Sequence, residues 1–119
     1  MIEQNSGSII NLSSPGADMG GKIDGGMAYA ASKAGIERLT NGLAEEVREY
    51  GISVNCFKPA GFIESEGLKY WSTPETDTEE WEPPDLMVKA SIFLAIQTSA
   101  GVTGRIFTEK QLDKEFDLG

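Results

Sequence analysis

The sequence predicts an α/β fold in which a small parallel sheet is flanked by helices. A short apolar run at residues 8–12 ends in a turn signal, which is typical of a buried strand. An amphipathic stretch at residues 36–50 predicts a helix, and a second strand begins directly after Gly51. Because a helix that leads into a strand through one glycine is typical of parallel α/β units, these observations favour that fold class.

The first strand is followed by a loop and then by the long helix. The turn signal at residues 13–16 contains proline and glycine, and residues 17–27 hold four glycines and two aspartates, which predicts a surface loop. In the helix, apolar side chains recur at intervals of three and four residues, and charged residues fill the other face. The apolar set is Ile36, Leu39, Leu43, Val47 and Tyr50. Gly51 is the expected carboxyl-terminal cap.

The second strand alternates Ile52, Val54 and Cys56 with polar residues and runs into Lys58 and Pro59. Cys56 is the single cysteine of the chain, so an internal disulfide is excluded. Its apolar neighbours predict a buried thiol. A reducing, cytoplasmic location fits this cysteine usage best.

Residues 60–84 predict a long loop with room for one short helix, because glycine and proline recur among exposed aromatic residues. We interpret its acidic stretch as a solvated surface in preference to a cation-binding or partner-binding segment. The acids are Glu75, Asp77, Glu79, Glu80, Glu82 and Asp85.

Residues 86–96 predict a helix with so little polar surface that it must be covered by its own domain or by a second subunit. A turn at 101–104 and a last strand at 105–108 follow. The charged tail at 109–119 has loosely helical apolar spacing. The chain of 119 residues therefore predicts one domain, residues 1–119, without internal repeats.

The composition excludes several classes of function. With 10 basic and 19 acidic residues the net charge is −9, which disfavours nucleic acid and anionic lipid as partners. The absence of histidine excludes Ser-His and Cys-His nucleophiles and imidazole metal sites, and no metal site is predicted. No apolar run approaches the roughly 18 residues of a membrane helix, so no membrane partner is expected.

A pair of side chains at the start of the long helix carries the chemistry. Tyr29 and Lys33 are four residues apart, so both project from one helix face. An ammonium group favours the phenolate form of a nearby tyrosine, which suits that tyrosine to proton transfer. By itself this spacing is common on ordinary helices.

Two further features converge on the same place. Ser13 and Ser14 end the first strand, and Pro59, Gly61 and Ile63 follow the second strand. In a parallel sheet the carboxyl ends of the strands form the edge at which ligands bind. The sequence therefore predicts a small-molecule site at this edge.

These motifs resemble those of the short-chain dehydrogenase/reductase family. The matching pieces appear in family order over most of the chain. They are Gly7-Ser8-Ile9-Ile10-Asn11-Leu12-Ser13-Ser14, Tyr29-Ala30-Ala31-Ser32-Lys33-Ala34-Gly35, Gly51-Ile52-Ser53-Val54-Asn55, Pro59-Ala60-Gly61-Phe62-Ile63 and, more weakly, Val102-Thr103-Gly104-Arg105-Ile106.

The resemblance implies a Rossmann-like fold and an oxidoreductase that uses NAD or NADP on a small carbonyl or alcohol substrate. Tyr29 would donate or accept the proton, Lys33 would bind the nicotinamide ribose, and Ser14 would position the substrate oxygen. Pro59, Gly61 and Ile63 would line the nicotinamide end. The loop at residues 65–81 corresponds to the variable substrate-binding region of the family.

Three departures from the family pattern limit these implications. Ser14 precedes Tyr29 by 15 residues, more than the usual gap, so Ser13 and Ser14 both remain candidates. The family's Pro-Gly is Pro59-Ala60-Gly61. No G-x-G-x-x-G turn is present to bind a pyrophosphate, so the chain is expected to be the carboxyl-terminal half of a doubly wound fold.

Three functions follow as alternatives. The first is catalysis, which the loss of cofactor contacts makes doubtful for the isolated chain. The second is a non-catalytic fragment that acts as a self-associating module. The resemblance implies that the long helix packs against its counterpart in a partner subunit, and an apolar helix and an open sheet edge also need cover, so a homo-oligomer is expected. The third is a vestigial α/β fragment without a present role.

Overall fold

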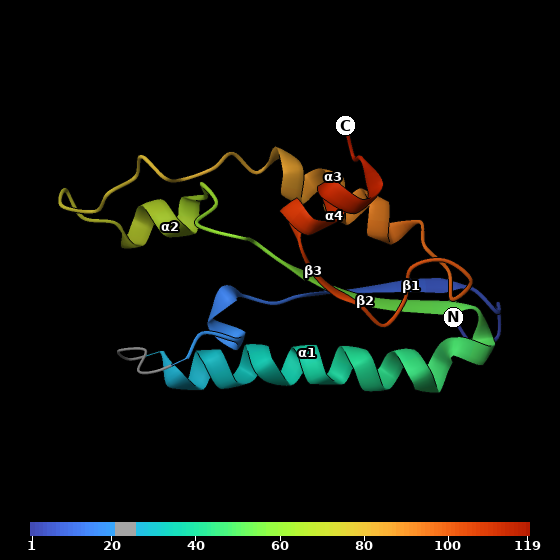
Figure 1. Ribbon diagram of the computed structural model, residues 1–119. Coiled ribbons are helices and arrows are strands. Elements are labelled where there is room, and N and C mark those ends of the chain that lie inside the picture. The colour runs from blue at the N-terminus through green and yellow to red at the C-terminus, as the bar shows by residue number, and fades with distance from the viewer. Residues whose placement is uncertain (21–25) are drawn as a thin grey trace.

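The computed structural model describes residues 1–20 and 26–119, which build a three-stranded parallel sheet between two layers of helix (Figure 1). The strands lie in the order β1 (Gly7–Leu12), β2 (Ile52–Lys58) and β3 (Ile106–Thr108). Leu12 pairs with Phe57 and Lys58 pairs with Thr108, so the three strands end at one edge. The predicted fold class, a partial Rossmann-like parallel sheet, is confirmed.

One face of the sheet is covered by α1 (Met27–Val47), the long helix below the strands in Figure 1. A 3-10 helix at Arg48–Tyr50 extends it to Gly51, whose left-handed backbone (φ 72°) ends the helix as expected. The core on this side packs the inner face of α1 against β1 and β2, because apolar residues of α1 recur with helical spacing. Its buried members are Ala44, Ile52 and Val54.

The other face is covered by α3 (Asp85–Ala95) and α4 (Glu109–Phe116). The charged tail forms α4 because Thr108 and Gln111 make a reciprocal capping box at its start. Leu112 points into the core, and Phe116 and Leu118 pack against it. The core on this side buries Phe57, Ala90, Leu94, Phe107 and Leu112.

The apolar helix α3 is less covered than its sequence predicts. Ala90 and Leu94 are fully buried, whereas Val88, Ile92 and Ile96, the residue that caps the carboxyl end of α3, are exposed. The exposed side chains are four residues apart, so they form one ridge on the outer face. The described part of the chain therefore buries the inner side of α3 only. Burial of its outer side by a second subunit remains a prediction.

The central strand β2 is buried along its whole length, although its sequence alternates apolar and polar residues. It lies between two strands and two helical layers, so both of its faces point inward. The polar side chains are satisfied there: Asn55 Nδ2 donates to Val102 O at 2.8 Å, and Ser53 Oγ to Ser8 Oγ at 3.0 Å.

The predicted long loop carries the short helix α2 (Glu66–Trp71), which Ser65 caps at its amino terminus. Tyr70 and Trp71 are exposed and stack edge to face. The predicted loop at 17–27 follows a 3-10 helix at Pro15–Ala17, and its residues 21–25 lie outside the described part. Across the residues that the structure describes, no helix is both long and apolar enough to span a membrane.

Candidate functional site

Tyr29 and Lys33 lie in the first turns of α1, beside the carboxyl end of β1. Lys33 Nζ is 5.6 Å from the centroid of the Tyr29 ring, within cation–π range. The same Nζ donates a hydrogen bond to the carbonyl oxygen of Leu12 at 2.9 Å. Tyr29 itself is 56% exposed. Lys33 therefore contacts both the accessible Tyr29 side chain and the end of β1, which leads into the two serines.

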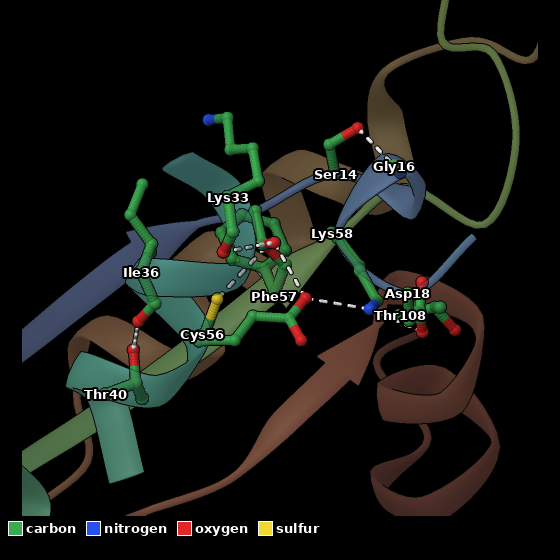
Figure 2. Close-up of polar contacts among 12 residues, drawn as sticks. Ser14, Gly16, Asp18, Lys33, Ile36, Thr40, Cys56, Phe57, Lys58 and Thr108 are labelled. Carbon is green, nitrogen blue, oxygen red and sulfur yellow. Dashed lines mark hydrogen bonds and ion pairs between the residues drawn. The ribbon is translucent and has the colours of Figure 1, made fainter. Parts of the chain in front are cut away.

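The two candidate serines have different surroundings. Ser13 is buried, and its hydroxyl donates to Glu37 Oε1 at 2.7 Å. Ser14 is partly exposed, and its Oγ accepts a hydrogen bond from the N–H of Gly16 at 3.2 Å. Figure 2 shows the Ser14 hydroxyl turned toward Gly16 in the upper part of the view, where Lys33 also extends. Ser14 is therefore the more accessible of the two candidates.

The segment after β2 forms the third part of the site. Pro59 and Ile63 are partly buried, and Gly61 is exposed with no atom within 4 Å of where a Cβ would lie. Ala60 separates Pro59 from Gly61, which are adjacent in the family pattern. Its N–H donates to Glu109 Oε2 at 2.7 Å. This contact holds the Pro59 turn, residues 59–63, against the start of α4.

A cleft of about 540 Å³ lies beside the Pro59 turn. Phe62 and Trp81 contribute aromatic surface to it, and Lys110, which is paired with Glu82, contributes charge. The other lining residues are Ala60, Gly61, Glu79 and Glu80. Part of the expected substrate loop therefore borders the same edge of the sheet.

Three charged residues that the sequence reasoning did not single out lie beneath these segments. Lys58 Nζ contacts Glu37 Oε1 at 2.8 Å and Asp18 Oδ2 at 2.9 Å. Burial opposes the charge on Lys58, but the two carboxylates outweigh burial and raise the pKa of Lys58. The sequence does contain one sign of these contacts. Lys58 ends a strand of buried residues, and because an unpaired buried charge is costly, its position predicts carboxylate partners.

The thiol of Cys56, which lies on β2 two residues before Lys58, is buried as predicted. Burial raises its pKa, and the Glu37 carboxylate raises it further. Because the thiolate is the reactive form of cysteine, these surroundings do not favour a nucleophile.

A sequence model described as short chain dehydrogenase matches residues 1–76, which contain both serines, Tyr29, Lys33 and the Pro59 turn. The chain belongs to the short chain dehydrogenase family. The predicted resemblance is thereby confirmed, and relatives of this family match nearly the whole chain.

Three relatives illustrate the range of the short chain dehydrogenase family. The 5-keto-D-gluconate 5-reductase of Escherichia coli (strain K12) is 30% identical over 89% of this chain and 44% of its own length. The 3-oxoacyl-(acyl-carrier-protein) reductase FabG of Chlamydia trachomatis is 36% identical over 91% of this chain and 45% of its own.

The third is a solved structure, the gluconate 5-dehydrogenase of Burkholderia cenocepacia in complex with NADP and tartrate. It superposes with a TM-score of 0.72 at 28% identity and covers 90% of this chain and 44% of that protein. This chain thus spans less than half the length of these short chain dehydrogenase relatives.

Proposed function

We propose that this chain carries the catalytic half of an NAD(P)-dependent oxidoreductase that interconverts a small carbonyl compound and an alcohol. The contact of Lys33 with both the Tyr29 ring and the end of β1 carries the proposal. It brings the proton-transfer pair to the strand that leads into Ser14. The relatives support the reaction class, because they are named as reductases of keto groups or dehydrogenases of alcohols.

Each side chain has a distinct role in this proposal. Tyr29, whose side chain is accessible to a substrate, holds the proton at its phenol oxygen. The Lys33 ammonium lies 5.6 Å from the centre of the Tyr29 ring, so its positive charge faces the phenol. Ser14 donates its hydroxyl hydrogen to the substrate oxygen, since its own oxygen already accepts from Gly16. Catalysis then depends on keeping these groups in fixed geometry.

The nicotinamide end of a cofactor fits the residues that are present. A Cβ at Gly61 would meet open space, so a flat ring can approach the backbone there. Lys33 would bind the ribose, and Pro59, Gly61 and Ile63 would line the ring, which supplies or accepts the hydride. The sequence contains no glycine-rich turn for the pyrophosphate, so we assign the chain to the carboxyl-terminal half of the family fold.

The proposal is tested by titrating NADH and NADPH into the purified chain, with the solution mass measured on the same sample. Saturable binding that is weakened by K33M supports the nicotinamide site. Absence of binding up to millimolar nucleotide would contradict the proposal for the chain by itself.

Activity provides the second test. If a panel of ketones and sugar acids yields a substrate, Y29F should lower kcat by at least about 10²-fold, the scale of general acid–base catalysis. Its urea unfolding curve should match that of the wild type, because Tyr29 is exposed. An unchanged kcat in Y29F would remove Tyr29 from the mechanism.

A self-associating module is the second candidate function. The ridge of Val88, Ile92 and Ile96 supports it, because exposed apolar side chains in a row are typical of an interface. The strand β1 supports it too, since within the described residues it pairs with β2 and leaves its other edge open. A homo-oligomer in the cytoplasm is the corresponding proposal.

A further inference from the structure

Lys58 occupies an unusual place for a lysine. It is the last residue of the central strand, and its side chain is only 9% exposed. A buried ammonium needs opposite charges and hydrogen bonds to offset its lost hydration. Glu37, itself 16% exposed at its side chain, and the more exposed Asp18 supply them.

The contacts of Lys58 reach each segment of the proposed site. Glu37 lies one helical turn after Lys33 on α1, and Asp18 follows the 3-10 helix that Ser14 caps. Pro59 is the next residue in the chain. Figure 2 shows Lys58 and Asp18 meeting below Ser14, with the chain of dashed contacts running back toward α1.

The network also includes the serine next to Ser14. Glu37 Oε1 accepts one hydrogen bond from Lys58 and a second from the Ser13 hydroxyl at 2.7 Å. One carboxylate oxygen therefore connects the end of β1, the end of β2 and the helix that carries Tyr29. An apolar side chain at position 58 could fill the space but would attract neither carboxylate.

We propose that Lys58 is a positioning residue that holds the serine turn, residues 13–18, and the Pro59 turn in register with α1. Its relevance to catalysis rests on the proposed function, which makes these segments parts of one site. Buried ion pairs contribute little net stability compared with apolar residues, but they do require a defined geometry. Lys58 therefore matters more for the order of the turns than for the stability of the fold.

Amide hydrogen exchange tests the positioning role without any need for activity. The N–H of Ala17 donates to the carbonyl oxygen of Ser14 at 2.9 Å, so its exchange reports on the serine turn. The N–H of Gln111, which donates to Thr108 Oγ1 in α4, serves as the internal reference. In K58M we expect exchange at Ala17 to accelerate at least tenfold relative to Gln111.

Two further variants separate positioning from stability. K69M removes a lysine that also contacts two carboxylates, but on the exposed helix α2, and should leave exchange at Ala17 unchanged. E37Q/K58M removes both buried charges, so the free energy of unfolding should recover relative to K58M. Exchange at Ala17 should nevertheless stay fast, because the link to Asp18 is still lost.

The outcomes are distinct. Exchange at Ala17 that is unchanged in K58M, or that recovers with stability in E37Q/K58M, overturns the positioning role. A wild type that binds no nucleotide overturns the proposed function, while the exchange data still decide the role of Lys58. If the wild type binds nucleotide, K58M should weaken binding about tenfold or more, and equal binding would overturn the link to the site.

Discussion

Lys58 and Glu109 are both buried at the carboxyl edge of the sheet, but they are partnered in different ways. Lys58 meets two carboxylates, so its charge is compensated. Glu109 is only 1% exposed and accepts one hydrogen bond, from Ala60. Its other oxygen, Oε1, has no hydrogen-bond partner within the described part of the chain. Glu109 thus depends on a single contact, which also fixes the Pro59 turn.

Replacement of Glu109 by alanine should lower the free energy of unfolding by about 0.5–1.5 kcal/mol, the net contribution of one hydrogen bond, because the N–H of Ala60 loses its protein acceptor. E109Q, which retains an oxygen acceptor, should cost less. Urea unfolding measures both, and E46A on the exposed face of α1 is the control. Equal stability of E109A and wild type would show that the Ala60 contact contributes nothing.

The raised pKa of Lys58 predicts a loss of stability in alkaline solution. A group whose pKa is higher in the folded state contributes stability below its ordinary value of 10.5, and that contribution fades as the pH rises through the folded pKa. The unfolding free energy of the wild type should therefore fall relative to that of E37Q/K58M above about pH 10.5. Urea titrations at pH 9, 10 and 11 measure it, and a constant difference would contradict the raised pKa.

At the scale of elements, the junction between α1 and β2 depends on one backbone conformation. Gly51 has a φ of 72°, and a Cβ there would lie 2.4 Å from the carbonyl oxygen of Asn5. Residues with side chains rarely adopt this conformation, and the neighbouring backbone cannot move without disturbing β1. The turn therefore needs glycine for two independent reasons.

Substitution of Gly51 and Gly35 by alanine should have opposite effects. G51A should lower the free energy of unfolding by about 2 kcal/mol or more. Alanine is strained in the left-handed backbone conformation, and its Cβ would clash with the carbonyl oxygen of Asn5. G35A, within α1, should raise it by about 0.5–1 kcal/mol, because a Cβ there meets no atom within 4 Å and alanine favours helix. Denaturant midpoints measure both, and a stable G51A would show that the turn can rearrange.

At the scale of the whole molecule, the outer ridge of α3 determines how the chain behaves in solution. A row of exposed apolar side chains, Val88, Ile92 and Ile96, is costly to leave in water. Among the described residues nothing pairs with the outer edge of β1, so a second chain could bury this edge as well as the ridge.

Sedimentation equilibrium should therefore give a mass above the 12.8 kDa of one chain at high protein concentration. I92E/I96E should shift the mass toward the monomer, because a buried carboxylate without a partner is strongly unfavourable. Y70E on α2 is a control for an exposed apolar residue away from the ridge, from α1 and from β1. A wild type that stays monomeric at the highest concentrations would argue against the self-associating module.

The sequence by itself determined the elements and their order. Helical periodicity in α1, the glycine that ends it and the strands on either side are local patterns, and each has a local physical cause. The same is true of the Tyr29–Lys33 spacing and of the serines and the Pro59 turn after their strands. The topology rule for parallel sheets then predicted one common edge, as the strand pairing shows.

Only the tertiary structure decided how buried side chains are partnered. Lys58, Glu37 and Asp18 are far apart in sequence, and no local rule brings them together. The difference between Ser13 and Ser14 likewise depends on Glu37 reaching across from α1. Partial exposure of α3 depends on how much of its surface α4 and the sheet cover. Partner choice and burial are properties of packing, whereas periodicity and turn chemistry are properties of the chain.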